Sequence, residues 1–231
     1  RLFHLDIDVG SYERAKVRFK SAGDRIYSRS YPMPLQAIID AAQILPSKRI
    51  QGVKELWYQI YGDYYRALQD KSVESVVLDT FTQLWEICRL AYLQELQEKQ
   101  SAGERIRERL QPIEYSEPNS RMRSIINIAR TSGKHLVLVH YMTDVYEKRL
   151  VDGKVEEMVT GRDFAGWKYV EGLADLLVET RVGKQKTDNG YKLVPECVVK
   201  LSGLGLGLVG MVLQEPSYNK LVAVAEAMSG E

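Results

Sequence analysis

Short, almost wholly apolar segments alternate along this chain with longer segments whose apolar residues recur every three or four positions. The short kind is typical of strands buried on both faces of a parallel sheet. It occurs at residues 73–80 and 136–140, and two further short strands that mix apolar and polar residues are expected at 2–8 and 26–31. The long kind is typical of helices, and the clearest example runs from Ile50 to Leu68 with a Trp/Tyr stripe that we expect to be a core face. The alternation predicts an α/β fold with a mainly parallel sheet covered on both faces.

The second half of the chain changes to paired strands. Asp152-Gly153 separates two strand-like segments and is a strong signal for a two-residue hairpin turn, and residues 188–190 mark a second hairpin. These hairpins predict antiparallel additions at the later edge of the sheet. Further helices are expected at residues 35–45, 81–110 with a break at Gly103, 120–129, 167–173 and 217–228, and further strands at 175–180, 191–201 and 208–214. No linker or repeat interrupts the pattern, so we expect residues 1–231 to form a single domain.

Composition narrows the class of protein only slightly. The 231 residues carry a formal net charge of +1, which neither favours nor excludes nucleic acid as a partner. Cys88 and Cys197 lie far apart without a CxxC partner, which argues against a disulfide framework or a zinc site and fits a reducing cytosol. The longest apolar run, residues 204–213, is too short and too glycine-broken to span a membrane. We therefore expect a cytoplasmic protein with no membrane partner.

A carboxylate ends the most apolar of the strand-like segments. Residues 73–80 have the sequence VESVVLDT, in which Asp79 is followed by Thr80. Open α/β sheets bind ligands at the carboxyl ends of their strands, where Asp79 could hold a hydrated Mg²⁺ and Thr80 could hydrogen-bond a phosphate or a water. This is the pattern of a Walker B strand. The alternative is that Asp79 caps the helix that begins near Phe81.

Two other strand-like segments also end in polar side chains. Asp6 and Asp8 end the first segment, at alternate positions and therefore on one face. His140 ends the segment at residues 136–140. Because the carboxyl ends of parallel strands meet at one edge of a sheet, we expect Asp8, Asp79 and His140 to converge.

Two glycine motifs look like nucleotide-binding loops but have the wrong context. The sequence TSGKH at residues 131–135 lacks the required earlier glycine and follows a helix instead of a strand, so Gly133 is predicted to cap that helix. The sequence GLGLVG at residues 205–210 has no βαβ unit after it, so we expect a bend or a close-packing segment there.

The order of these segments resembles the RecA-like core of P-loop ATPases. A carboxylate-ended strand precedes the VVLDT strand, and a polar-ended strand with a hairpin follows. The resemblance narrows to the phage RecA-like ATPases linked to single-strand DNA annealing and recombination, through the sequences LQPIEY, NSRMR, LVLVH and EPSYNKL, which begin at residues 110, 119, 136 and 215. It covers essentially the whole chain and implies a three-layer α/β/α fold with ATP and Mg²⁺ as ligands.

The resemblance also implies a role for each matching residue. Asp79 would position Mg²⁺ through water, and Asp8 would orient the water that attacks the nucleotide, with Asp6 as a less favoured substitute. His140 occupies the sensor position, where a polar side chain reports the γ-phosphate. Asp8 departs from the family pattern, because a Glu is usual there.

Lys200 is similar to a basic residue that reaches the nucleotide of a neighbouring subunit in the family, which implies a homo-oligomer. The family carries a second lysine where this chain has Ser202. The phosphate-binding loop precedes the first of these strands in the family fold, so we expect it upstream of Arg1. Without that loop these residues alone should not hydrolyse ATP.

Three functions are compatible with this picture. The leading hypothesis is an ATP-dependent DNA-binding protein of phage recombination or replication, with single-stranded DNA and other phage replication or recombination proteins as partners, in the host cytoplasm. The second is a RecA-fold binding or scaffold protein that no longer hydrolyses nucleotide. A small-molecule kinase is a third, less favoured because no arginine-rich lid is evident.

Residues 141–164 are the expected contact with single-stranded DNA. They follow His140 directly and combine the cations Lys148, Arg149 and Arg162 with aromatic side chains, a mixture that single strands favour. The hairpin also carries five carboxylates that would repel phosphate, so an ordinary exposed hairpin is the alternative, slightly favoured by these charges; they are Asp144, Glu147, Asp152, Glu156 and Glu157.

Overall fold

The computed structural model describes residues 1–18, 20–34, 49–151, 154–187, 190–203 and 206–229. The helix expected at residues 35–45 lies outside this part of the chain. Two compact units divide the rest, Arg1–Lys168 and Tyr169–Glu231, and they are described separately below. A single domain over residues 1–231 stays a prediction, because compact units of this kind can unfold together or apart.

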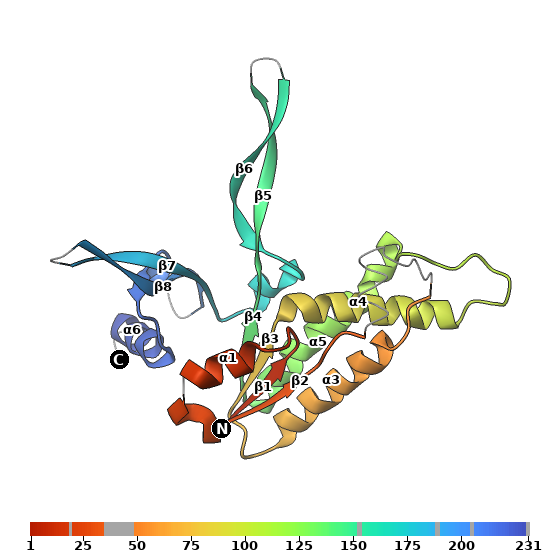
Figure 1. Ribbon diagram of the computed structural model, residues 1–231, viewed down its shortest axis with the longest axis horizontal. Coiled ribbons are helices and arrows are strands. Elements are labelled where there is room, and N and C mark those ends of the chain that lie inside the picture. The colour runs from red at the N-terminus through yellow and green to blue at the C-terminus, as the bar shows by residue number, and fades with distance from the viewer. Residues whose placement is uncertain (19, 35–48, 152–153, 188–189, 204–205, 230–231) are drawn as a thin grey trace. The chain divides into compact units, whose positions relative to one another are not determined.

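A four-stranded parallel sheet organises the first unit (Figure 1). Its strands are β1 (Leu2–Asp6), β2 (Ile26–Ser30), β3 (Ser75–Asp79) and β4 (His135–Val139), in the spatial order β2-β1-β3-β4. The chain leaves β1 toward β2 on one side and leaves β3 toward β4 on the other. The direction of winding therefore reverses between β1 and β3, and such a switch point opens a crevice at the carboxyl ends of the two strands. The mixed α/β class and the parallel sheet are confirmed.

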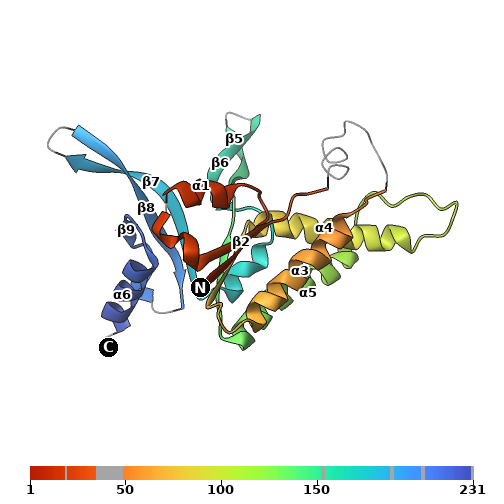
Figure 2. The same ribbon diagram turned by 60° about the horizontal axis from the view of Figure 1, so that its bottom comes forward.

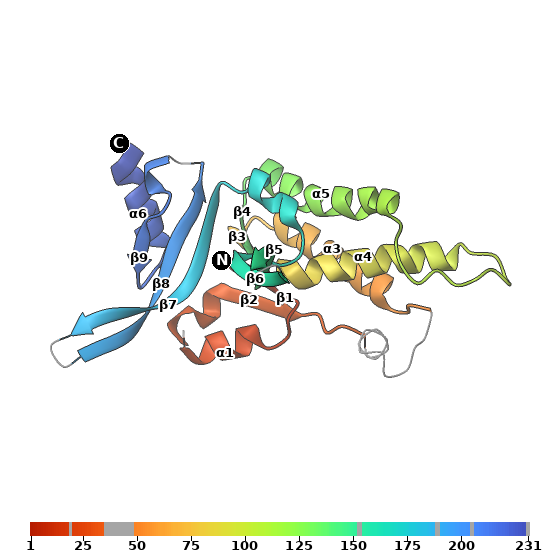
Figure 3. The ribbon, with the colours of Figure 1, turned by 90° about the horizontal axis from the view of Figure 1, so that it is seen from above.

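Helices lie on both sides of this sheet (Figure 3). α1 (Ser11–Arg18), followed by the 3₁₀ helix η1 (Lys20–Arg25), faces the His4 side of β1, where the rings of Tyr12 and His4 are 6.1 Å apart. α3 (Val53–Gln69), α4 (Phe81–Glu98) and α5 (Ser116–Ser132) cover the other side. Leu78 of β3 meets side chains from all three of those helices. The stripe on α3 is a core face as expected, since Trp57 and Tyr64 are buried.

β4 is the least covered strand of the sheet. Among the described residues it pairs only with β3, and Val137 and Val139 are exposed although β4 is wholly apolar after His135. Both valines lie on the side of the sheet that α1 occupies farther along, next to half-buried Val77. An apolar face and an unpaired edge therefore adjoin the carboxyl end of β3.

The helix predicted over residues 81–110 is shorter in the structure, where α4 ends at Glu98. The side chains of Gln97 and Gln100 bind the backbone of the following loop, which turns at Gly103 with φ +93°. α5 begins four residues before the expected start, with Pro118 in its first turn, after the short 3₁₀ helix η2 (Pro112–Tyr115). Gly133 ends α5 in the left-handed conformation, as expected.

The first hairpin is a two-stranded antiparallel ribbon of β5 (Met142–Val151) and β6 (Lys154–Phe164). The hairpin prediction is confirmed, and both strands extend further than expected toward the sheet. The antiparallel strands do not extend the parallel sheet, which corrects that prediction: they form separate two-stranded and three-stranded sheets.

The second unit is built on the other hairpin. β7 (Leu176–Thr187) pairs with β8 (Gly190–Ser202), and β8 also pairs with β9 (Val212–Gln214). Figure 2 shows α6 (Tyr218–Ser229) beside these strands. The 3₁₀ helix η3 (Lys168–Leu173) precedes β7, and a second, η4 (Leu206–Leu208), occupies the start of the strand expected at residues 208–214. That strand is consequently shorter than predicted.

Gly183 is the tightest position in this hairpin. A Cβ atom there would lie 2.3 Å from Cδ of Glu196, whose buried carboxylate crosses β7 and pairs with Nε of Arg181 at 2.6 Å. Only glycine leaves room for this ion pair across the ribbon.

Candidate functional site

Asp79 ends β3 at the switch point, and a buried histidine holds it. Oδ2 of Asp79 is 3.3 Å from Nε2 of His4, whose Nδ1 is 2.9 Å from Oγ of Ser28. The hydrogen bond with His4 is the main cause that lowers the pKa of Asp79 below its ordinary value. Asp79 is therefore ionised at neutral pH while its side chain stays partly accessible to solvent.

Thr80, not Asp79, caps α4. Its hydroxyl oxygen accepts a hydrogen bond of 3.1 Å from the backbone N–H of Gln83, and the residue is 2% exposed. The alternative role of Asp79 as the helix cap is therefore wrong. A contact between Thr80 and a phosphate would have to use the hydroxyl hydrogen of this buried side chain.

The two carboxylates at the end of β1 have different surroundings. Asp6 is 1% exposed and accepts hydrogen bonds from the backbone of Gly10 (2.9 Å) and the hydroxyls of Ser11 (2.8 Å) and Ser30 (3.2 Å). These hydrogen bonds stabilise the turn between β1 and α1 and attach the end of β2 to the end of β1. Asp6 is therefore a structural carboxylate.

Asp8 lies beside Asp79 because the turn is bound to β3. The backbone N–H groups of Ile7 and Asp8 both donate to the carbonyl oxygen of Asp79, at 2.6 and 3.1 Å. The peptide bond that follows, between Asp79 and Thr80, is cis. The structure thus brings together Asp8 and Asp79, as the sequence predicted, and selects Asp8 over Asp6 as the accessible member of the pair.

Tyr141 contacts one of these two carboxylates, and the sequence did not assign this residue to the site. Its hydroxyl donates to Oδ2 of Asp8, and this bond is the main cause that raises the pKa of Tyr141 to about 12. The charge of Asp79 adds to the same shift, while Arg14 opposes it. The one signal in the sequence was its position directly after an apolar strand and His140.

His140 lies apart from the carboxylates. Its Nδ1 is 3.2 Å from the carbonyl oxygen of Ala165, and its ring packs at 5.4 Å from Phe81 and 5.0 Å from Phe164. Burial lowers its pKa, so the imidazole is neutral, and its buried Nε2 has no hydrogen-bond partner among the described residues. His140 therefore supports the junction of α4 and β6, and within the described residues it forms no hydrogen bond or ion pair with Asp8 or Asp79.

Thr82 binds the start of the β5–β6 ribbon to α4. Its hydroxyl donates to the carbonyl oxygen of Ala165 at 3.0 Å and accepts from the backbone N–H of Tyr141 at 3.1 Å. The carbonyl oxygen of Tyr141 in turn accepts from the N–H of Ala165. The residue that contacts Asp8 is therefore also the residue from which the ribbon begins.

The chemistry open to this site is that of a hard cation bound largely through water. In the described part of the chain no group of three His, Cys, Asp or Glu side chains is arranged to hold a metal ion. Mg²⁺ is usually bound by one or two carboxylates, with waters and phosphate oxygens as the remaining ligands. Asp79 and Asp8 fit that need, and they do not form a complete metal cage by themselves.

The remaining predicted site residues have carboxylate partners or lie elsewhere. Nζ of Lys200, on β8 in the second unit, is 2.7 Å from Oε2 of Glu179. In the β5–β6 ribbon Lys148 pairs with Glu157 at 3.7 Å and Arg162 with Asp144 at 3.3 Å. Arg149 is opposite Glu156 in the ribbon, and its side chain lies outside the described atoms.

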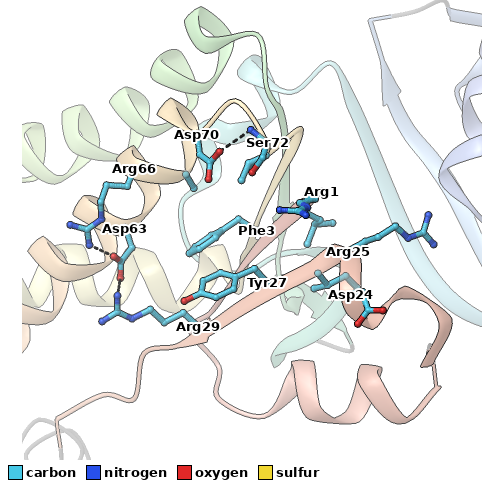
Figure 4. A pocket seen from close by; sticks show the side chains of 14 residues that line it. Arg1, Phe3, Asp24, Arg25, Tyr27, Arg29, Asp63, Arg66, Asp70 and Ser72 are labelled. Atoms are coloured by element: carbon cyan, nitrogen blue, oxygen red, sulfur yellow. Dashed lines mark hydrogen bonds and ion pairs between the residues drawn. The ribbon is translucent and has the colours of Figure 1, made fainter.

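A pocket of about 600 Å³ lies at the opposite, amino ends of β1 and β2 (Figure 4). Its aromatic wall is the pair Phe3 and Tyr27, whose rings are 5.1 Å apart. Arg29 and Arg66 both pair with buried Asp63, so two cations share one carboxylate and that part of the wall keeps a net positive charge. None of the site residues predicted from the sequence lines this pocket.

No protein-family model and no curated protein matches this chain. Among the described helices, none has both the length and the apolar character to cross a membrane.

Proposed function

We propose that this protein binds a nucleoside triphosphate with Mg²⁺ at the carboxyl edge of its sheet and is a RecA-like ATPase that acts on single-stranded DNA. The observation that carries the proposal is the convergence of Asp8 and Asp79 at the switch point between β1 and β3. Open α/β sheets bind ligands at this place. His4 supports the same role, because it keeps Asp79 in the anionic form that a cation needs.

In this proposal each carboxylate has one task. Asp79 binds the waters of Mg²⁺, which would neutralise charge on the phosphates when bound. Asp8 orients the attacking water, and the Tyr141 hydroxyl fixes the rotamer of Asp8. Thr80 contributes by beginning α4 at a fixed place beside the site.

The phosphates would be held by a loop whose sequence motif is not among these 231 residues. A strand that carries such a loop fits the unpaired edge of β4, and the helix after it fits the uncovered side of Val137 and Val139. This arrangement would give the sheet the three layers that the RecA-like resemblance implies.

Tyr141 connects the proposed nucleotide site to the ribbon that we expect to contact DNA. A change at Asp8 would move the phenol that begins the β5–β6 ribbon, which is where we expected the DNA contacts of Lys148, Arg149 and Arg162. The ion pairs of Lys148 and Arg162 are exposed and therefore weak, so a phosphate could replace their carboxylate partners. Assembly into a homo-oligomer, with Lys200 near a neighbour's nucleotide, belongs to the same proposal.

The second candidate is a RecA-fold scaffold that binds partners without turnover. Two observations favour it: the hydroxyl of Thr80 already accepts a hydrogen bond inside the protein, and the ring of half-buried His140 bonds the carbonyl oxygen of Ala165 and neither carboxylate. If His140, at the sensor position, cannot reach the nucleotide, it cannot report the γ-phosphate to the rest of the protein.

The test is ATP turnover and Mg²⁺-dependent nucleotide binding by the full protein, with Asp79→Asn and Asp8→Asn as variants. Both should lower turnover by at least about 100-fold, because each removes a charge that acts in the transition state. Asp24→Asn, an exposed carboxylate outside the site, is the matched control and should leave turnover unchanged. Binding without turnover in the parent protein would select the scaffold, and the absence of both would overturn the nucleotide site.

A further inference from the structure

One face of the β7–β8 hairpin combines lysines with exposed apolar and aromatic side chains. Residues that alternate along each strand share a face, and the register places Lys184 opposite Leu193 and Lys186 opposite Tyr191. We call this surface the Lys/Tyr face. Its members are Val182, Lys184, Lys186, Tyr191, Leu193 and Pro195.

The Lys/Tyr face is not part of the core of its unit. All six residues are exposed, and the large side chains are far more exposed than usual: Val182 is 70%, Tyr191 73% and Leu193 65% accessible. The opposite face of the same hairpin carries the buried residues Gly183, Val194 and Glu196. Farther along β8, Cys197 and Val199 on the same side as the Lys/Tyr face are buried, so its own unit leaves that side uncovered only over residues 182–186 and 191–195.

The charge on this part of the hairpin is positive and uncompensated. Over the described residues 181–187 and 190–196 the only carboxylate is that of Glu196, and it is buried against Arg181. Lys184, Lys186 and Lys192 form no ion pair with any described residue. The β5–β6 ribbon is different, because Lys148 and Arg162 there each face a carboxylate.

We propose that the Lys/Tyr face binds single-stranded nucleic acid. Lys184 and Lys186 are two residues apart on one strand, so their backbones are separated by about 6.7 Å, a spacing comparable to one nucleotide step of an extended single strand. Tyr191, beside Lys186, offers an exposed ring on which a base can stack. The proposal rests on the proposed function only for the class of partner, and it needs no bound nucleotide.

Nucleic acid fits this face better than a lipid surface does. Its aliphatic members Val182, Leu193 and Pro195 form one small cluster, and the rest of the face, toward the turn, consists of two lysines and a tyrosine. A membrane-binding face gains most of its affinity from buried apolar area. Alternating cations and a π-face are the features that single strands use.

The experiment measures the affinity of the full protein for a short fluorescent oligothymidine over a series of salt concentrations, without nucleotide. The double variant Lys184→Ala/Lys186→Ala should flatten the slope of log K against log salt by about 1.4, since each neutralised phosphate contributes about 0.7. Tyr191→Ala should weaken binding by about 5- to 150-fold, while Tyr191→Phe keeps the ring and should retain the affinity.

A matched control lies on the same hairpin. Lys192→Ala removes one charge from the opposite face of β8 and should change the slope less than Lys184→Ala does. Circular dichroism of each variant checks that the protein stays folded.

Three outcomes would overturn the proposal. The first is parent-like affinity and slope in the Lys184→Ala/Lys186→Ala variant. The second is a change of slope in Lys192→Ala that equals the change in Lys184→Ala. The third is binding to phosphatidylserine vesicles through Lys184 and Lys186 with no binding of oligothymidine. Failure here is distinguishable from failure of the ATPase proposal, because Asp79→Asn tests turnover and leaves the Lys/Tyr face intact. If Asp79→Asn loses turnover while the variants of the Lys/Tyr face bind oligothymidine as the parent does, only the proposal for the nucleic-acid surface is rejected.

Discussion

At the scale of single residues, the site depends on neighbours that fix each carboxylate in one state. His4 is buried between Ser28 and Asp79, and it accounts for the lowered pKa of Asp79. Tyr141 orients Asp8 by donating a hydrogen bond to its Oδ2. Sequence patterns located both carboxylates, because apolar strands that end in a charge are conspicuous. They could not locate His4 or Tyr141, since those contacts join residues 75 and 133 positions apart.

The lowered pKa of Asp79 predicts a specific dependence of stability on pH. A carboxyl group whose pKa is lower in the folded state stabilises that state above its unfolded pKa, here the ordinary 3.8. That stabilisation is lost as the pH falls through the lower folded value. The difference in free energy of unfolding between the parent and Asp79→Asn should therefore shrink as the pH falls below about 4.

Urea unfolding at a series of pH values measures this difference. Asp24→Asn serves as the control for general loss of charge, because Asp24 is exposed and outside the site. A difference between the parent and Asp79→Asn that stays constant from neutral to acid pH would contradict the role given to His4.

At the scale of elements, sequence predicted where strands and helices occur better than where they end. The four parallel strands were all located: β3 and β4 contain continuous apolar runs, and β1 and β2 are short strand-like segments bounded by turn residues. α4 was predicted to continue past Glu98 because Glu, Lys and Arg are good helix formers, whereas Gln97 and Gln100 bind the backbone of a loop instead. The separate antiparallel sheets were missed, because a hairpin signal does not say which sheet the hairpin joins.

The β7–β8 hairpin gives a prediction at this scale. Gly183→Ala places a methyl group within 2.3 Å of the Glu196 carboxylate, which must turn aside and disturb its contact with Arg181, so the free energy of unfolding should fall by about 0.5–1.5 kcal/mol. Glu196→Ala removes the obstacle, so the double variant should lose less stability than the sum of the two single losses.

Chemical denaturation of the four proteins gives this comparison. Gly161→Ala in β6 is the control, because nothing lies within 4 Å of its added Cβ and the change should stay within about 0.5 kcal/mol. Strict additivity of the Gly183 and Glu196 substitutions would show that the two positions do not contact each other in solution.

At the scale of the whole molecule, the two compact units differ in how much core they contain. The second unit, of roughly 60 residues, buries few large side chains, and a unit of that size is marginally stable by itself. The first unit holds the parallel sheet and the helices that cover it. The prediction of one domain requires the two units to unfold together, whereas independent units would unfold at different denaturant concentrations.

The three tryptophans make this testable, because Trp57, Trp85 and Trp167 all belong to the first unit. Tryptophan fluorescence reports the unfolding of that unit, whereas far-ultraviolet circular dichroism reports both units. Coincident denaturation curves by the two methods are expected. A dichroism transition that precedes the fluorescence transition would show that the second unit is a separate domain.

The hydrogen bonds of Asp6 have a consequence for genetics. Its carboxylate holds the turn that brings Asp8 to Asp79, although it is too buried to meet a ligand. A screen for inactive alleles would therefore recover substitutions at Asp6 together with those at the two accessible carboxylates. Only the Asp6 alleles should be heat-sensitive and poorly accumulated in cells, so protein abundance would separate a lesion of the scaffold from a lesion of the chemistry.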